Sequence, residues 1–146
     1  MIFRSAGACL LALLLASCAE ELTLEQQIIG TINEMEAFAE AGERRSFMAM
    51  VTEDFSGQLK TLTKEEFRRF MILQWNVNLR LHAALGPIHV RSLGAGMAVA
   101  EFSGLITGGR GWIPERGQLY QFRTTWLLDG NDWLLATAQW GPIRID

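Results

Sequence analysis

The sequence predicts an α+β domain, because its apolar residues change period once along the chain. Up to Trp75 they recur every three or four residues, as in an amphipathic helix, and farther on they alternate or form short runs broken by turn residues. Five Trp and eight Phe among 146 residues provide enough large side chains for one core. Helices first and antiparallel strands after them make an α+β arrangement.

Two predicted helices begin with the same motif. Thr23-Leu24-Glu25-Gln26 and Thr63-Lys64-Glu65-Glu66 are capping boxes, in which the Thr hydroxyl and the side chain three residues later bond free backbone N–H groups. We expect the first helix to stop at Gly42 and a short helix to follow over about 43–51. The helix after Thr63 keeps a helical apolar spacing through Trp75.

Strands are expected in the second half of the chain. Gly86-Pro87 interrupts the first strand pattern, and turns at 94–96 and 129–132 each join two strands into a hairpin. Residues 107–117 are rich in Gly and predict a loop between the hairpins. The expected strands are 77–82, 88–93, 97–106, 119–128 and 133–140.

Residues 1–17 are predicted to be a signal peptide. Arg4 precedes an apolar stretch over 6–16, and small residues lead to Cys18. The apolar run of about 11 residues is too short to span a bilayer, which takes about 20. Leu15-Ala16-Ser17-Cys18 resembles the lipobox of bacterial lipoproteins, which implies cleavage before Cys18 and lipid attachment to it. Ordinary secretion with an unmodified Cys18 is the alternative.

The expected organisation is a signal peptide over 1–17, a lipidated cysteine and tether over 18–22, and one domain over 23–146. Bacterial lipoproteins carry two or three acyl chains, which anchor stably. If the host is Gram-negative, Ala19 in place of Asp favours the outer membrane, and the resemblance then implies an envelope protein that faces the periplasm.

The charge and cysteine content exclude some classes of function. Without residues 1–17 the chain keeps twelve basic and sixteen acidic residues and has no basic patch, which argues against nucleic-acid binding. Cys18 is then the only cysteine, so an intramolecular disulfide is excluded.

The order of elements resembles the nuclear transport factor two-like superfamily, which includes SnoaL-like proteins and ketosteroid isomerases. Residues 41–43, residues 50–55 and the hairpin from Trp126 to Trp133 carry the resemblance, which covers nearly all of 23–141. It implies N-terminal helices packed in the concave face of a curved antiparallel sheet that forms a cone. Such cones often hold a ligand pocket inside and a dimer face outside.

The resemblance permits a test for isomerase chemistry, which needs a carboxylate base and an oxyanion hole of Tyr and protonated Asp. The tyrosine, base and acid positions fall at Met35, Leu59 and Thr124, so this activity is not expected. His82 and His89 are more typical of surface residues than of metal ligands, and Glu53-Asp54 is more typical of a solvated turn than of a catalytic pair. We therefore expect no catalytic residue, metal or other cofactor.

The last hairpin predicts one wall of a pocket. With Gly130-Asn131 as a two-residue turn, Thr124 faces Thr137 and Phe122 faces Gln139. One face then combines aromatic rings with a few hydroxyl and amide groups, as in pockets for small apolar ligands. Its residues are Tyr120, Phe122, Thr124, Trp126, Thr137 and Gln139. The alternative is that these aromatic side chains fill the cone completely.

Two surfaces are candidates for contacts with partners. The outer face of the same hairpin would suit a partner or a second copy, and it would carry Gln121, Arg123, Thr125, Ala136, Ala138 and Trp140. Trp112 and Ile113 either contact a partner or membrane or fold back over the mouth of the cone.

The sequence as a whole predicts a membrane-anchored envelope lipoprotein whose domain binds a small apolar ligand or a protein partner. A SnoaL-like enzyme with an atypical polar pocket and a structural lipoprotein that dimerises through its sheet remain alternatives.

Overall fold

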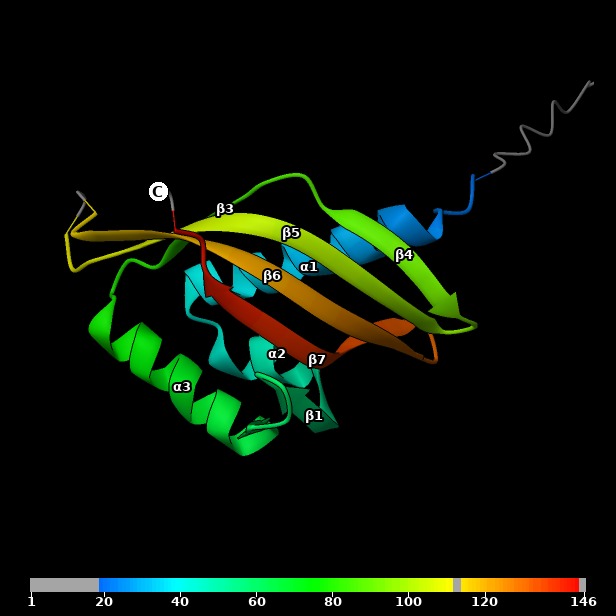
Figure 1. Ribbon diagram of the computed structural model, residues 1–146, viewed down its shortest axis with the longest axis horizontal. Coiled ribbons are helices and arrows are strands. Elements are labelled where there is room, and N and C mark those ends of the chain that lie inside the picture. Colours follow the sequence, from blue (N-terminus) through cyan, green and yellow to red (C-terminus); the bar gives the residue numbers. More distant parts are fainter. Residues whose placement is uncertain (1–18, 112–113, 145–146) are drawn as a thin grey trace, which may run out of the picture.

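The computed structural model describes residues 19–111 and 114–144 (Figure 1). Its elements are α1 (Leu24–Ala41), α2 (Arg44–Ala49), β1 (Val51–Gly57), β2 (Leu62–Thr63), α3 (Lys64–Val77), β3 (His82–Leu85), β4 (His89–Gly94), β5 (Met97–Gly108), β6 (Arg116–Asp129) and β7 (Asp132–Pro142). The α+β prediction is confirmed. No helix within the described ranges has the length and apolar character needed to cross a membrane.

The strands form one curved sheet in the order β2-β1-β7-β6-β5-β3, with β4 paired to another part of β5. β1 runs parallel to β7, whereas the other strand pairs are antiparallel, so the sheet is mixed and not wholly antiparallel as expected. The three helices pack on the concave side of the sheet (Figure 1).

Both capping boxes are formed. Thr23 N donates to Gln26 Oε1 over 2.9 Å, and Gln26 N donates to Thr23 Oγ1 over 3.2 Å. Thr63 and Glu66 make the same pair of bonds at 2.7 and 3.3 Å. α1 ends before Gly42, whose φ of 69° is left-handed, as the predicted stop requires.

The expected strand over 77–82 is wrong. α3 continues to Val77, and β3 begins only at His82. The backbone N–H and the side-chain amide of Asn78 both donate to Gln74 O, at 2.8 and 3.1 Å, and so extend the helical turn by one residue. The alternation of apolar residues there was accidental.

The register of the last hairpin departs from the prediction halfway along. Trp126 faces Leu135 as expected, but the register then shifts by one residue, and Thr124 faces Ala138 while Phe122 faces Trp140. This β-bulge adds one residue to β7 opposite the junction of Thr125 and Trp126. Beyond the bulge, Ala138 and Trp140 point inward and not to the outer face. The predicted pairing of Thr124 with Thr137 and of Phe122 with Gln139 is therefore wrong.

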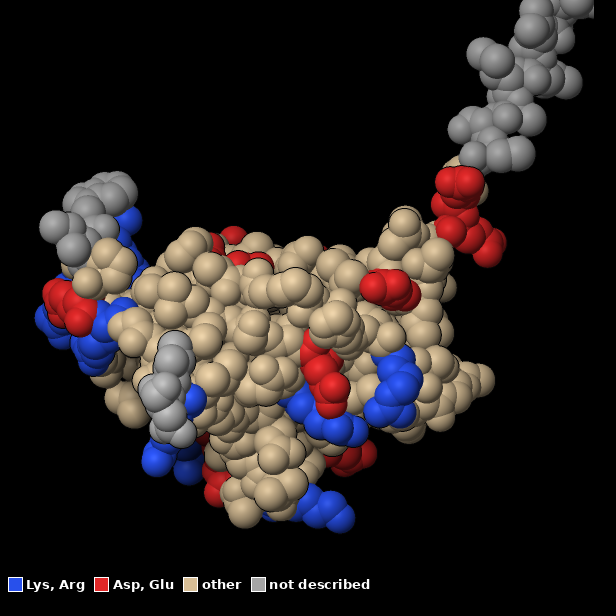
Figure 2. Space-filling view, turned by 45° about the horizontal axis from the view of Figure 1, so that its top comes forward, with Lys and Arg blue, Asp and Glu red and all other residues tan. Residues whose placement is uncertain are grey.

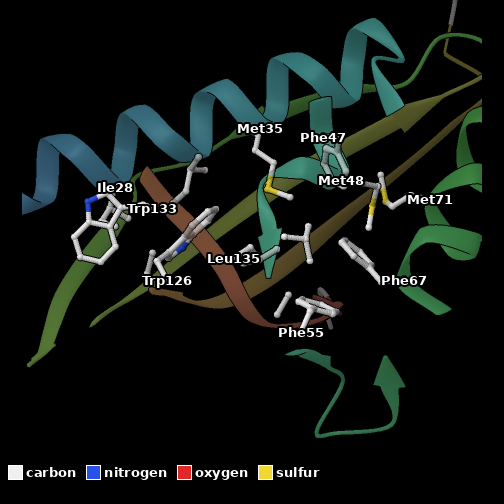
Figure 3. Packing of buried hydrophobic residues seen from close by; sticks show 14 of the residues in the cluster. Ile28, Met35, Phe47, Met48, Phe55, Phe67, Met71, Trp126, Trp133 and Leu135 are labelled. Carbon is white, nitrogen blue, oxygen red and sulfur yellow. The ribbon is translucent and has the colours of Figure 1, made fainter. Parts of the chain in front are cut away.

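Below the first half of α1 the core contains a group of buried side chains (Figure 3). Ile28 from the helix and Trp126 from the sheet are 0% and 1% exposed, and Trp133 packs beside them. Each indole N–H has a partner, since Trp126 Nε1 donates to Thr124 Oγ1 over 2.8 Å and Trp133 Nε1 donates to Gln27 Oε1 over 2.9 Å. We call Ile28, Trp126 and Trp133 the narrow end of the cone.

Candidate functional site

A cavity of about 240 Å³ lies between the second half of α1, α3 and the inner face of the sheet. Its deep part is walled by buried apolar side chains. α1 and the helices after it contribute Ile32, Met35, Phe47, Phe67 and Met71, and the sheet contributes Phe102, Trp126, Leu135 and Ala138. The cavity leaves the predicted cone only partly filled.

Four of the six predicted pocket residues line this cavity: Tyr120, Phe122, Thr124 and Trp126. Thr137 and Gln139 do not, because the bulge in β7 turns them to the exposed outer face. Ala138 and Trp140 occupy the inward positions in their place. The spacing of the apolar residues of β7 changes from two to three between Leu135 and Ala138, which was the signal for the bulge.

Aromatic contacts close the side of the cavity between α3 and the sheet. The Trp140 ring lies 5.9 Å from Phe67 and 5.5 Å from Phe70, measured between ring centroids. On the other side, Phe102 and Phe122 stack with centroids 5.1 Å apart. Aromatic rings therefore form part of the cavity wall on both sides.

The one hydroxyl in the deep part of the cavity is already engaged. Thr124 Oγ1 donates to Ala100 O over 3.3 Å and accepts the indole N–H of Trp126. Thr124 is only 6% exposed. The deep part therefore presents an apolar surface with its polar atoms satisfied internally.

The lining also contains four partly exposed polar residues, Glu36, Glu40, Gln74 and Tyr120, which we call the mouth of the cavity. Glu36 and Glu40 come from α1, Gln74 from α3 and Tyr120 from β6. Neither glutamate was expected from the sequence to belong to the site.

The two glutamates differ in their partners. Glu40 Oε1 lies 2.6 Å from His82 Nδ1 and accepts the backbone N–H of Ala83 over 2.8 Å. No hydrogen bond or ion pair within the described ranges reaches the Glu36 carboxylate. Burial and then the Glu40 charge raise the pKa of Glu36 above its usual range, while His82 opposes the shift.

The structure shows where the three positions that isomerase chemistry would use lie. Met35 and Thr124 line the cavity, but Leu59 is 77% exposed in the turn that follows β1 and lies outside it. None of the three supplies a carboxylate or phenol. Among the described residues no cluster of three or more His, Cys, Asp or Glu side chains is placed to hold a metal ion.

The remaining predicted residues lie on the surface or outside the described ranges. His89 is exposed, and exposed Glu53 pairs with Lys64 over 2.7 Å, which lowers the pKa of the Glu53 carboxyl. Cys18, Trp112 and Ile113 lie outside the described residues.

The outer face of the sheet has a polar centre. There Arg123 Nη1 lies 2.8 Å from Glu101 Oε1 across β6 and β5. Figure 2 shows acidic and basic side chains interspersed with broad uncharged areas over one side of the molecule.

Comparisons with known proteins identify the fold. No family profile matches the sequence, and no curated protein matches it. A protein from Novosphingobium aromaticivorans, provisionally named a scytalone dehydratase, has a TM-score of 0.72 at 9% identity, over 82% of this chain and 84% of that one. A protein of the NTF2-like family from Streptomyces avermitilis, provisionally named a dehydratase, has a TM-score of 0.71 at 16% identity, over 82% and 96%.

An NTF2-like protein of unknown function from Pseudomonas putida has a TM-score of 0.66 at 12% identity, over 83% of this chain and 89% of that one. At these identities the likeness concerns the fold alone. The chain thus has the nuclear transport factor two-like cone fold that its sequence resembles.

Proposed function

We propose that this protein is a membrane-anchored lipoprotein of the bacterial envelope whose cone binds a small, mostly apolar ligand. The cavity carries the proposal. Protein interiors pack to a density of about 0.75 and leave few voids larger than one water molecule. A cavity of about 240 Å³ is several times larger than a water molecule and only slightly smaller than the about 300–1,000 Å³ of typical ligand sites. A ligand with one or two rings would fit this volume.

The position of the tether gives the cavity a direction relative to the proposed anchor. Residues 19–22 span at most about 14 Å, so a lipid on Cys18 would hold the start of α1 near the headgroups. α1 has 18 residues and is about 27 Å long, and Glu36 and Glu40 lie in its second half. The chain enters α1 at one end of the molecule, and residues 109–111 lie at the other (Figure 1). The mouth would therefore open away from the membrane, toward the periplasm.

An enzyme is the second candidate. The Glu40 carboxylate holds His82 Nδ1, which is how a carboxylate orients an imidazole base. However, the His82 side chain is 65% exposed and does not line the cavity. Binding is therefore the better supported function.

The anchor is tested by replacing Cys18. We expect Cys18→Ser to move the protein from the membrane fraction to the soluble fraction, because the acyl chains would have no attachment site. Cys9→Ser is the matched control, since Cys9 lies in the predicted signal peptide and should leave anchoring unchanged. A Cys18→Ser protein that still pellets with membranes would contradict the lipoprotein assignment.

The ligand is tested by native mass spectrometry of the Cys18→Ser protein purified from cells without detergent. We expect an added mass that is lost on denaturation. Ala83 lines the cavity and Ala84, its neighbour in β3, is exposed on the opposite face. Ala83→Leu should therefore abolish the added mass, and Ala84→Leu should retain it. An added mass that survives Ala83→Leu would place the ligand elsewhere, and the same spectrum reports whether two copies associate.

A further inference from the structure

We infer that the ligand carries a positively charged hydrogen-bond donor, such as a protonated amine, at the end that lies beside Glu36 and Glu40. The inference rests on the proposed function, because it concerns the ligand of the same cavity. It adds the chemical class of that ligand, an apolar body with a cationic end.

Two carboxyl groups from the same helix border the cavity. Glu36 and Glu40 are four residues apart on α1 and so lie on the same face of the helix, and both line the cavity. The other polar groups of the mouth, Gln74 on α3 and Tyr120 on β6, are neutral. Besides burial, two side chains act on the pKa of the Glu36 carboxyl: Glu40 raises it, and His82 on β3 lowers it.

The two carboxyl groups differ in the number of polar partners that they have. Glu40 already accepts a hydrogen bond from the Ala83 backbone N–H, and its Oε1 lies 2.6 Å from His82 Nδ1. Glu36 is half-buried and lacks a hydrogen-bond or salt-bridge partner among the residues of known position. A carboxylate that loses part of its hydration without gaining a partner is unfavourable, which is also why its pKa is raised. A cationic ligand group would supply the missing partner.

The deep part of the cavity and its mouth differ in polarity. The deep part is apolar and the Thr124 hydroxyl is engaged, so a charged group gains nothing there. The ligand would place its apolar body against Trp126, Leu135 and Phe102, with its charge at the mouth. An anionic end would instead meet two acidic side chains, and like charges at close range discriminate against a ligand.

Three probes that share one phenyl ring test the charge preference: 2-phenylethylamine, 2-phenylethanol and phenylacetate. Binding is measured near neutral pH, where the amine is protonated, with the full chain carrying Cys18→Ser and no detergent. The fluorescence of Trp126 and Trp140, which line the cavity, reports binding, and calorimetry gives the affinities. We expect the amine to bind about fivefold more tightly than the alcohol, as one partly exposed ion pair allows, and phenylacetate to bind most weakly.

A matched pair of variants assigns the preference to Glu36. Glu36→Gln keeps the size and polarity of the side chain, and it should bring the amine and the alcohol within about twofold of each other. Glu34→Gln, on an exposed side of the same helix and outside the cavity, should leave the preference unchanged.

The outcomes separate the two proposals. Binding of all three probes with equal affinity, or an amine preference that persists in Glu36→Gln, would overturn the inference and leave the proposed function standing. If none of the probes binds and no ligand accompanies the protein from cells, both fail. Tighter binding of phenylacetate would show that the mouth selects the opposite charge.

Discussion

The narrow end and the mouth of the cone lie under the same helix and differ in how they use it. At the narrow end Ile28 packs on two tryptophans, and both indole N–H groups are hydrogen-bonded. Two turns farther along α1, the side that faces the sheet carries Glu36, and another turn on Glu40, over a space that the side chains do not fill. Burial of apolar side chains therefore stabilises the narrow end, whereas the mouth borders an unfilled cavity and carries a carboxylate without a hydrogen-bond partner among the described residues. Stability should therefore respond most to substitutions at the narrow end, and the charge preference of the ligand should respond to substitutions at the mouth.

The largest expected effect is at the narrow end. Trp126→Ala removes a side chain that is 1% exposed and breaks its bond to Thr124, so it should lower the free energy of unfolding by about 3–5 kcal/mol. Urea unfolding followed by circular dichroism measures the change. Leu128→Ala, on the same strand but 43% exposed, should cost no more than about 0.5 kcal/mol. A loss below about 1 kcal/mol for Trp126→Ala would show that the narrow end does not hold the fold together.

A smaller effect is expected where the end of β5 packs against the end of α3. A Cβ at Gly108, the last residue of β5, would overlap the buried Asn78 side chain, which lies directly against this glycine. Gly108→Ala should cost about 1–3 kcal/mol in the same urea experiment, because the well-packed neighbour must move.

Gly30 is the matched control for Gly108. A Cβ there would meet no atom within 4 Å, and the residue lies inside α1. Gly30→Ala should therefore stabilise the protein by up to about 1 kcal/mol, the difference in helix propensity. If both substitutions stabilise, the contact between Asn78 and Gly108 is not a constraint.

The same contrast explains how far the sequence could predict the structure. Both ends of α1 and the start of α3 were predictable because Thr23, Thr63 and Gly42 act within one turn of the chain. β1 was not predicted, and the second helix was expected to reach about residue 51, where β1 begins. Exposed Glu53 and Asp54 interrupt the apolar alternation of β1, and its register with β7 is irregular. Its parallel pairing depends on contacts with the far end of the chain.

The site was predictable only in part, for a related reason. Tyr120, Phe122, Thr124 and Trp126 follow from alternation in one strand. The bulge changes which side chains of the last residues of β7 face inward, and its position is known only once β7 is paired with β6. The change of spacing before Ala138 gave a local signal. From the sequence alone, Glu36 and Glu40 cannot be distinguished from ordinary exposed charges on a helix, and only the position of the sheet shows that they line a cavity. Local motifs thus predict where elements begin, and the cavity depends on how distant elements meet.

The smallest expected effect concerns the charge at the mouth. Burial and Glu40 raise the pKa of Glu36 in the folded protein, so the unfolded chain loses this proton first as the pH rises. Protonated Glu36 thus makes a favourable contribution to the free energy of unfolding. This contribution is fully present below the ordinary pKa of about 4.3, and it is lost as the pH rises through the higher pKa of the folded protein. At neutral pH the carboxylate therefore destabilises the empty protein. Glu36→Gln should raise the free energy of unfolding there by about 0.2–0.5 kcal/mol, the usual size of a like-charge pair four residues apart.

The pH dependence distinguishes this effect from a general change in packing. The gain of Glu36→Gln over the wild type should shrink toward zero below about pH 4, where the carboxyl is protonated in both states. Glu34→Gln, whose side chain is exposed, should show no such trend. Because 2-phenylethylamine would neutralise the charge, saturating amine should stabilise the wild type more than Glu36→Gln at neutral pH. A variant that is less stable than the wild type at neutral pH would mean that the Glu36 carboxylate already has a favourable partner, and the mouth would then have no unsatisfied charge for a ligand to meet.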